Sequence, residues 1–211
     1  MTTEPRPRRR TALALLSVVV LLAGGALALA PPKGKEKGMK PVPQASASWK
    51  DVDRLVGEQK YEEAAKAAET ILAAAKAKGN EADWTKALVT VTQLRIGLHG
   101  YETAVRRLRE EPWPEGALPR AQLSLLYGHS LVTYQRAYSW EIGQRERVDT
   151  RGAVDLKAWT REQILAEALR AALDVWKLRE ALGKEPVSAA GLVLDANSYP
   201  KEIRGSLRDA V

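Results

Sequence analysis

The sequence predicts an all-α fold of antiparallel helical hairpins behind an N-terminal apolar segment. Two observations lead to this prediction. Through most of residues 48–211, apolar side chains recur every three or four positions, which is the period of an amphipathic helix. Residues that cap helices, such as Ser, Thr, Asn and Gly, stand between these periodic stretches and divide them into helices of ordinary length.

An export segment occupies the N-terminus. Four arginines among residues 6–10 precede the uncharged residues 11–30, which are mostly Ala, Leu and Val. The export machinery keeps the basic end in the cytoplasm while the apolar run enters the bilayer. We therefore expect an exported protein whose folded part lies in the periplasm or cell envelope.

Sequence leaves two fates open for this segment. Residues 26–28, Ala-Leu-Ala, form an acceptable cleavage site for a signal peptide. The 20 uncharged residues are also long enough to span a bilayer uncut. Residues 1–30 are accordingly a signal peptide or an anchor in the inner membrane.

The chain behind this segment divides into a tether and a helical domain. Residues 31–47 are rich in Pro, Gly and Lys without periodicity, which is typical of a flexible tether. Residues 48–211 form the helical domain. The net charge of +7 resides in residues 1–50, which hold nine basic and two acidic side chains. Because residues 51–211 are therefore electrically balanced, we expect no nucleic-acid partner. Cysteine is absent, which excludes both disulfides and lipid attachment at a Cys.

The first half of the domain is expected to form four helices. Ser48 is a suitable N-cap with Asp51 in the first turn, and Gly79 closes the second helix. Gly100 ends the third helix, and the fourth stops before Pro112. The expected ranges are residues 49–56, 61–78, 81–98 and 101–111.

A longer helix is expected next. It begins near Pro119, a residue that suits the first helical position, and continues to about Arg147, with bends at Gly128 or Ser139. A polar loop follows at residues 149–158. The side chains expected to face the core are Leu123, Leu126, Tyr127, Leu131, Tyr134, Tyr138 and Ile142.

A capping box begins the following helix, because Gln163 stands three residues after Thr160, and Gly183 is expected to close it. Its apolar residues fall on two flanking stripes, so we expect helix neighbours on both sides. The inner stripe is Ile164, Ala168, Ala171, Val175 and Leu178, and the outer stripe is Leu165, Leu169, Ala172 and Trp176.

The C-terminal part of the chain is less regular. Residues 186–200 show no periodicity, and a last amphipathic stretch begins near Lys201 with Ile203 and Leu207. This stretch contains no helix stop signal before Val211, so we expect the chain to be a fragment of a longer protein.

An internal repeat with a spacing of 40 residues relates KYEEAAKAA (60–68) to GYETAVRRL (100–108). Tyr and Ala recur at the turn, where small residues let two helices approach closely. Repeats of this kind are typical of tetratricopeptide-like or α-solenoid-like hairpins, in which each unit buries its apolar face on its neighbour.

Few residues in this sequence are suited to catalysis. The two histidines, His99 and His129, are far apart in the chain, and there is no Cys. The sequence also lacks a nucleophile elbow, a phosphate-binding Gly loop and a paired-His helix. We therefore predict that the protein is not an enzyme and has no catalytic residue, no cofactor-binding residue, no metal ligand and no cofactor.

Two aromatic segments have both a functional and a structural interpretation. The segment YSWEIGQRERV (138–148) contains Trp and Arg, which are enriched in interface hot spots. We favour the structural interpretation, in which Tyr138 and Ile142, with Trp140 as a further candidate, pack inward and Glu141 pairs with Arg145. Trp113, which stands between two prolines, is likewise expected to plug a helix corner.

Several segments resemble the N-terminal helical region of bacterial alpha-2-macroglobulin-like proteins. They are SWKDVDRLVGEQKYEEA (48–64), NEADWTKALV (80–89), YSWEIGQRERV (138–148), AWTREQI (158–164) and NSYPKEIRGSLRDAV (197–211). The resemblance covers about residues 48–211. It implies an exported protein that continues into β-sandwich domains and, in some members, traps proteases through a thioester between Cys and Gln. This chain has no Cys, so that machinery is absent from it.

On this resemblance, the chain is expected to be the non-catalytic helical N-terminal domain of an exported alpha-2-macroglobulin-like protein, with a role in protease inhibition or envelope defence. The alternative is a periplasmic, membrane-tethered helical-repeat scaffold for protein–protein interaction. Both functions require a protein partner, such as a protease or an envelope protein. Both also include membrane contact through residues 11–30 if these are not cleaved.

Overall fold

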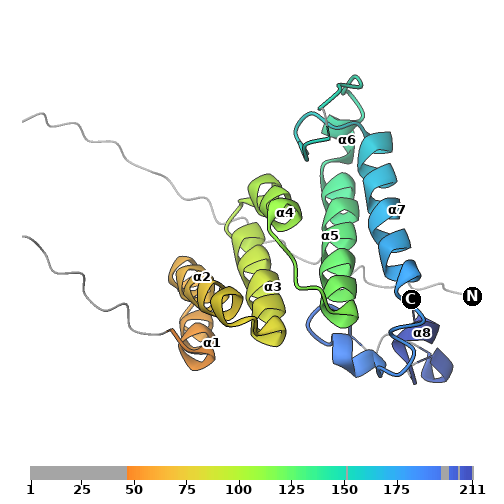
Figure 1. Ribbon diagram of the computed structural model, residues 1–211. Coiled ribbons are helices and arrows are strands. Elements are labelled where there is room, and N and C mark those ends of the chain that lie inside the picture. Colours follow the sequence, from red (N-terminus) through yellow and green to blue (C-terminus); the bar gives the residue numbers. More distant parts are fainter. Residues whose placement is uncertain (1–46, 151, 196–199, 204, 211) are drawn as a thin grey trace, which may run out of the picture. The chain divides into compact units, whose positions relative to one another are not determined.

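The computed structural model of the chain describes residues 47–150, 152–195, 200–203 and 205–210. The expected export segment and nearly all of the expected tether lie outside these ranges. The described residues belong to one compact unit, Gln44–Val211. They form helices and turns without a strand, which confirms the all-α prediction for this part of the chain (Figure 1). None of their helices has the length and apolar character that crossing a membrane requires.

The first four helices lie within one residue of their expected ends. They are α1 (Trp49–Gly57), α2 (Tyr61–Lys78), α3 (Glu81–Gly97) and α4 (Tyr101–Glu110). Ser48 caps α1, and its side chain and that of Asp51 form the reciprocal bonds of a capping box. Gly79 ends α2 in the left-handed conformation, which glycine adopts without steric cost.

The 40-residue repeat extends to the backbone geometry. Gln59 and His99 are the two non-glycine residues with positive φ in the described ranges, at 60° and 65°. After each of them, the next amide donates to a carbonyl oxygen five residues earlier, at 2.9 Å in both copies. The side chains that follow are buried at equivalent positions, namely Ala64 and Ala104, Ala65 and Val105, and Ala68 and Leu108.

The expectation of one helix reaching Arg147 is wrong. The chain forms α5 (Ala117–Ala137), breaks at Tyr138, and adds a single turn, α6 (Ser139–Ile142). Pro119 is the third residue of α5 rather than the first. Its missing N–H is still harmless there, because the first four amides of a helix have no helical acceptor.

The helix predicted from the Thr160 capping box is α7 (Arg161–Lys177), and both bonds of the box are present. It ends before Gly183, and turns occupy the residues between. The elements described after α7 are all short. They are η1 (Val187–Ala190), η3 (Lys201–Ile203) and α8 (Leu207–Ala210).

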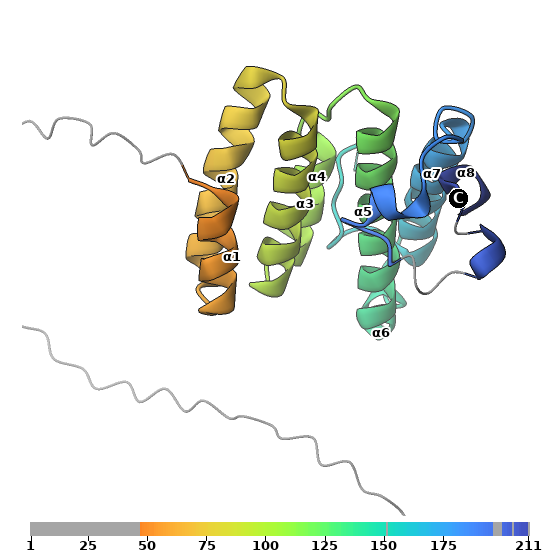
Figure 2. The ribbon, with the colours of Figure 1, turned by 90° about the horizontal axis from the view of Figure 1, so that it is seen from below.

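The longer helices lie side by side in a row, α2 beside α3, α3 beside α5, and α5 beside α7, in both views (Figures 1 and 2). α1 packs on α2, and α4 packs on α3 and α5. One large apolar core runs through these contacts, with Leu108, Leu123 and Ile164 fully buried in it. A second, smaller core joins the start of α5 and the end of α7 to η1 and α8 through Ala121, Val175 and Leu207.

Candidate interaction surface

The two apolar stripes of α7 have opposite environments. Ile164, Ala168, Ala171 and Val175 of the inner stripe are buried against the rest of the fold. The outer stripe has no helix against it in the described part of the chain, which differs from the expectation of neighbours on both sides. Four large side chains on this side of α7 are exposed, namely Leu165, Leu169, Leu173 and Trp176. Leu169 is the most exposed of them, at 60%.

A close approach between α5 and α7 buries the inner stripe. A Cβ atom at Gly128 of α5 would lie 3.4 Å from the Cβ of Ala171 and 3.5 Å from the carbonyl oxygen of Ala168. Small residues therefore stand on both sides of the contact, and the two helices pack closely through them. The outer stripe lies beside this contact on the neighbouring face of α7, where α5 does not cover it, because consecutive helix residues such as Ile164 and Leu165 point in directions about 100° apart.

A groove of about 670 Å³ follows the outer stripe, between α5 and α7. Its polar lining residues include Gln93, His129 and Arg136. Its walls are otherwise mainly apolar, formed by Leu125, Leu126, Val132, Leu165, Ala168, Leu169, Ala172, Val193 and Leu194. An apolar groove beside an exposed apolar stripe is typical of a site for protein association.

A second hollow of about 480 Å³ continues this surface toward the start of the domain. It is lined by Val56 and Tyr61 at the α1–α2 turn and by Thr90, Leu94 and Gly97 of α3. Gln93 lines both hollows, so they adjoin at this residue. We refer to the two hollows together with the outer stripe of α7 as the apolar surface.

One positive charge on the apolar surface is uncompensated. Arg136 of α5 lines the groove, is exposed, and has no ion-pair partner in the described ranges. The neighbouring His129 shares a contact of 3.4 Å with the hydroxyl of Thr133. The sequence around Arg136 shows no pattern that marks this residue. Its position in an apolar groove depends on how α5 and α7 pack, which the sequence does not reveal.

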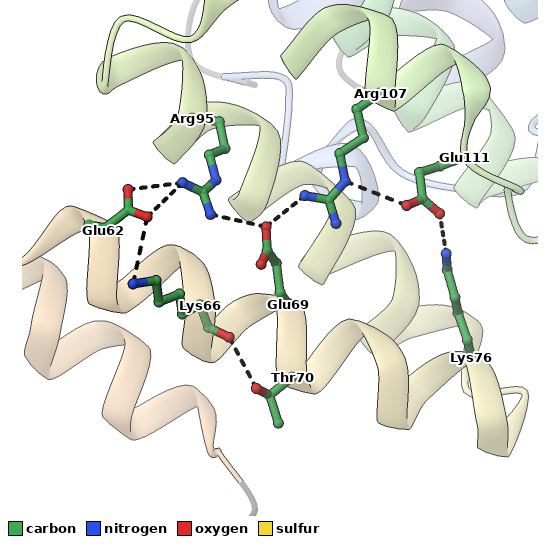
Figure 3. A network of polar contacts seen from close by, with 8 residues as sticks. All are labelled: Glu62, Lys66, Glu69, Thr70, Lys76, Arg95, Arg107 and Glu111. Atoms are coloured by element: carbon green, nitrogen blue, oxygen red, sulfur yellow. Dashed lines mark hydrogen bonds and ion pairs between the residues drawn. The ribbon is translucent and has the colours of Figure 1, made fainter. Parts of the chain in front are cut away.

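A second polar feature, a network of ion pairs, is structural. Figure 3 shows acidic and basic side chains of α2, α3 and α4 alternating across the surface between these helices. The Arg95 guanidinium contacts Glu62 at 2.9 Å and Glu69 at 3.2 Å, and Arg107 contacts Glu69 at 2.6 Å. Burial opposes the charge of Glu69, yet hydrogen bonds from Arg107 and Arg95 hold its pKa below the usual range. Because these charges satisfy one another, the network stabilises the packing of α2 on its neighbours and leaves little charge for a ligand.

The structural interpretation of the segment 138–148 is confirmed for Ile142 and for the Glu141–Arg145 pair, but not for Tyr138 and Trp140. Ile142 is buried, and Arg145 pairs with Glu141 at 2.9 Å. Arg145 also donates to the carbonyl oxygens of Leu156 and Trp159, a role that the sequence did not reveal. Tyr138, which was expected to face the core, is instead exposed.

Trp140 and Trp113, the tryptophans of the two aromatic segments, lie in different environments. Trp140, a candidate for inward packing, is instead 80% exposed, and it lies outside the lining of the apolar surface. Trp113 packs against the main core, and its Nε1 donates to the carbonyl oxygen of Leu108 at 2.7 Å, as expected for a residue that plugs a helix corner.

The histidines do not form a catalytic arrangement within the described ranges. His99 is exposed at the turn before α4, whereas His129 lies within α5, and neither contacts a carboxylate there. Those ranges also contain no cluster of three or more His, Cys, Asp or Glu side chains that could hold a metal ion.

Comparison of the chain with models of protein families, with curated proteins and with solved structures finds no match to any of the three.

Proposed function

We propose that residues 48–211 form a non-catalytic, protein-binding domain of an exported protein, and that its apolar surface binds an amphipathic helix of a protein partner. The observation that carries this proposal is the outer stripe of α7. Its three large apolar side chains, Leu165, Leu169 and Trp176, are exposed beside an apolar groove, and Leu173 next to them is exposed as well. Contiguous exposed apolar surface of this kind is uncommon on a soluble protein that has no partner.

The spacing of the stripe favours a helix as the occupant. Leu165, Leu169 and Trp176 recur at helical intervals and extend over about 16 Å, the length of three helical turns. A partner helix laid along α7 would place its own apolar residues at i, i+3, i+4 and i+7 into the groove. The unpaired charge of Arg136 favours an acidic residue at the edge of that helix.

A stack of helical hairpins, tetratricopeptide-like or α-solenoid-like, is the architecture that we propose for this domain. The support is the repeated backbone turn at Gln59 and His99, together with the burial of apolar side chains at equivalent positions after each turn. In such stacks each hairpin buries its face on the next, and the last hairpin keeps an apolar face unless another element covers it.

Two kinds of full-length protein could contain this domain. In the first, residues 48–211 are the helical front end of an alpha-2-macroglobulin-like protein with a role in protease inhibition or envelope defence. In the second, they are a helical-repeat scaffold tethered at the membrane, which the 40-residue repeat favours. Reading the gene beyond the codon for Val211 distinguishes them, because only the first predicts a long series of β-sandwich domains.

A model peptide tests binding at the apolar surface. The probe is a fluorescent amphipathic helix of four turns with Leu at the apolar positions and Glu on its edges, titrated with the full chain in lipid nanodiscs and followed by anisotropy. We expect Leu169→Glu and Trp176→Ala to weaken binding about tenfold or more, as for residues at the centre of an interface.

The matched control is Trp140→Ala, which removes an exposed tryptophan outside the apolar surface and should leave binding unchanged. A version of the peptide with Lys in place of Glu should bind more weakly. Equal binding by the Leu169→Glu variant would exclude the apolar surface as the docking site.

A further inference from the structure

A cavity separate from the apolar surface, of about 380 Å³, lies where α4, α5 and α7 meet. It shares only Ser124 with the lining of the apolar surface. Four basic side chains line it, Arg109 from α4, Arg120 from α5, and Arg170 and Lys177 from α7. Residues that are far apart in sequence thus bring their positive charges together at one site.

A carboxylate behind the cavity holds two of these arginines. Glu167 of α7 is only 17% exposed, and it accepts a hydrogen bond of 2.9 Å from the hydroxyl of Tyr127. It also accepts a bond of 2.7 Å from Nε of Arg170, and Nε of Arg109 lies 3.7 Å away. Glu167 therefore acts as an internal counter-ion that orients Arg109 and Arg170 and leaves part of each guanidinium for a ligand.

The charges of the cavity do not balance. Asp174 also pairs with Arg170 at 3.4 Å and with Lys177 at 2.9 Å. Arg120 has no ion-pair partner within the described ranges. Four cations therefore face two carboxylates, Glu167 and Asp174, which leaves two positive charges without a counter-ion.

We propose that this cavity binds a phosphate monoester. Such a group carries about two negative charges at neutral pH and concentrates them on three acceptor oxygens. The guanidinium groups of Arg109 and Arg120 supply donors in the fork geometry that phosphate accepts. Trp113 and Leu178, which also line the cavity, would contact the carbon skeleton of the ester. The same phosphate chemistry occurs in soluble esters and in phosphatidic acid at a membrane surface.

Isothermal titration calorimetry tests the proposal on the full chain in nanodiscs of neutral lipid, with empty nanodiscs as the blank. The soluble probes are glucose 6-phosphate, inorganic phosphate and succinate, and vesicles that contain phosphatidic acid form a separate arm. We expect glucose 6-phosphate to bind more tightly than succinate, and Arg120→Gln and Arg109→Gln each to weaken it about fivefold or more.

Arg136→Gln is the matched control. Like Arg120, Arg136 is an exposed arginine of α5 without an ion-pair partner in the described ranges. Unlike Arg120, it lines the groove of the apolar surface and not this cavity. This variant should bind the ester normally and bind the Glu-edged model helix more weakly, whereas Arg120→Gln should show the opposite pattern. The two proposals can therefore fail independently. Thermal unfolding of each variant checks that it folds.

The outcomes separate the two sources of phosphate. Binding of glucose 6-phosphate supports a soluble ester, and binding restricted to phosphatidic acid vesicles and lost in Arg120→Gln supports a headgroup. The proposal is overturned if neither source binds at millimolar concentration, if succinate binds as tightly as the ester, or if Arg120→Gln binds normally.

Discussion

The hydroxyl of Tyr127 on α5 donates a hydrogen bond of 2.9 Å to Oε1 of Glu167 on α7. Burial raises the pKa of Tyr127 far above its usual range, and the charge of Glu167 adds to this effect. Burial also disfavours the charge of Glu167, but hydrogen bonds from Arg170 and Tyr127 more than offset it and hold its pKa below the usual range. One partly buried hydrogen bond thus joins the packing of α5 on α7 to the basic cavity.

Tyr127→Phe removes this hydrogen bond and keeps the buried ring. We expect the free energy of unfolding to fall by about 1–2 kcal/mol, since a bond to a charged acceptor is lost while Arg170 still satisfies the carboxylate. Urea unfolding followed by circular dichroism measures the change. Tyr138→Phe is the matched control. Because Tyr138 is exposed, this substitution should change the free energy of unfolding by no more than about 0.5 kcal/mol.

The lowered pKa values of Glu167 and Glu69 predict a loss of stability in acid. Because each folded-state pKa lies below the unfolded value of about 4.3, the carboxylates stabilise the fold fully above that pH, and their contribution is lost as the pH falls through the folded-state values. Urea unfolding between pH 7 and pH 3 should show this decline. Glu167→Gln should reduce its steepness, whereas Glu110→Gln, at an exposed position, should not.

Ile164→Ala and Leu165→Ala test the orientation of α7. Ile164 is fully buried, so its truncation should cost about 2–5 kcal/mol of unfolding free energy. Leu165 is the next residue and is 37% exposed, so its truncation should cost clearly less, about 1 kcal/mol. Thermal or urea unfolding of the two variants compares them directly. Similar losses at both positions would mean that the outer stripe is covered.

Gln59→Gly and His99→Gly test the structural repeat. Both residues adopt positive φ, which strains an L-amino acid and suits glycine. We expect each substitution to raise the free energy of unfolding by about 0.5–1 kcal/mol, because relief of strain exceeds the entropy cost of glycine. Gln93→Gly, within α3, should instead lower stability. Opposite signs at Gln59 and His99 would contradict an equivalent role of the two turns.

Local patterns predicted most helices correctly, because their ends depend on neighbouring residues. Ser48 with Asp51, and Thr160 with Gln163, form capping boxes from side chains three residues apart. Gly79 ends a helix through its own backbone freedom. The 40-residue repeat was also visible in the sequence, and the same backbone turn occurs in both copies.

Contacts between distant residues account for the errors. The sequence indicated a bend at Ser139 but not that the helix would end there, and Arg145 holds the chain after the break at Tyr138 through the carbonyl groups of Leu156 and Trp159. The sequence indicated the Glu141–Arg145 pair, which is local, but not these longer-range bonds, which depend on how the following loop returns.

By itself, the sequence determined the helical class, most of the helix boundaries and the two apolar stripes of α7, since each follows from residues within one or two turns. Only the tertiary structure decided which stripe α5 covers, and therefore that Leu169 faces solvent while Ile164 is buried. It also gathered Arg109 and Arg120 with basic residues of α7 around one cavity. The physical reason is that burial and charge balance depend on which helices meet, and the periodicity of a single helix does not specify its neighbours.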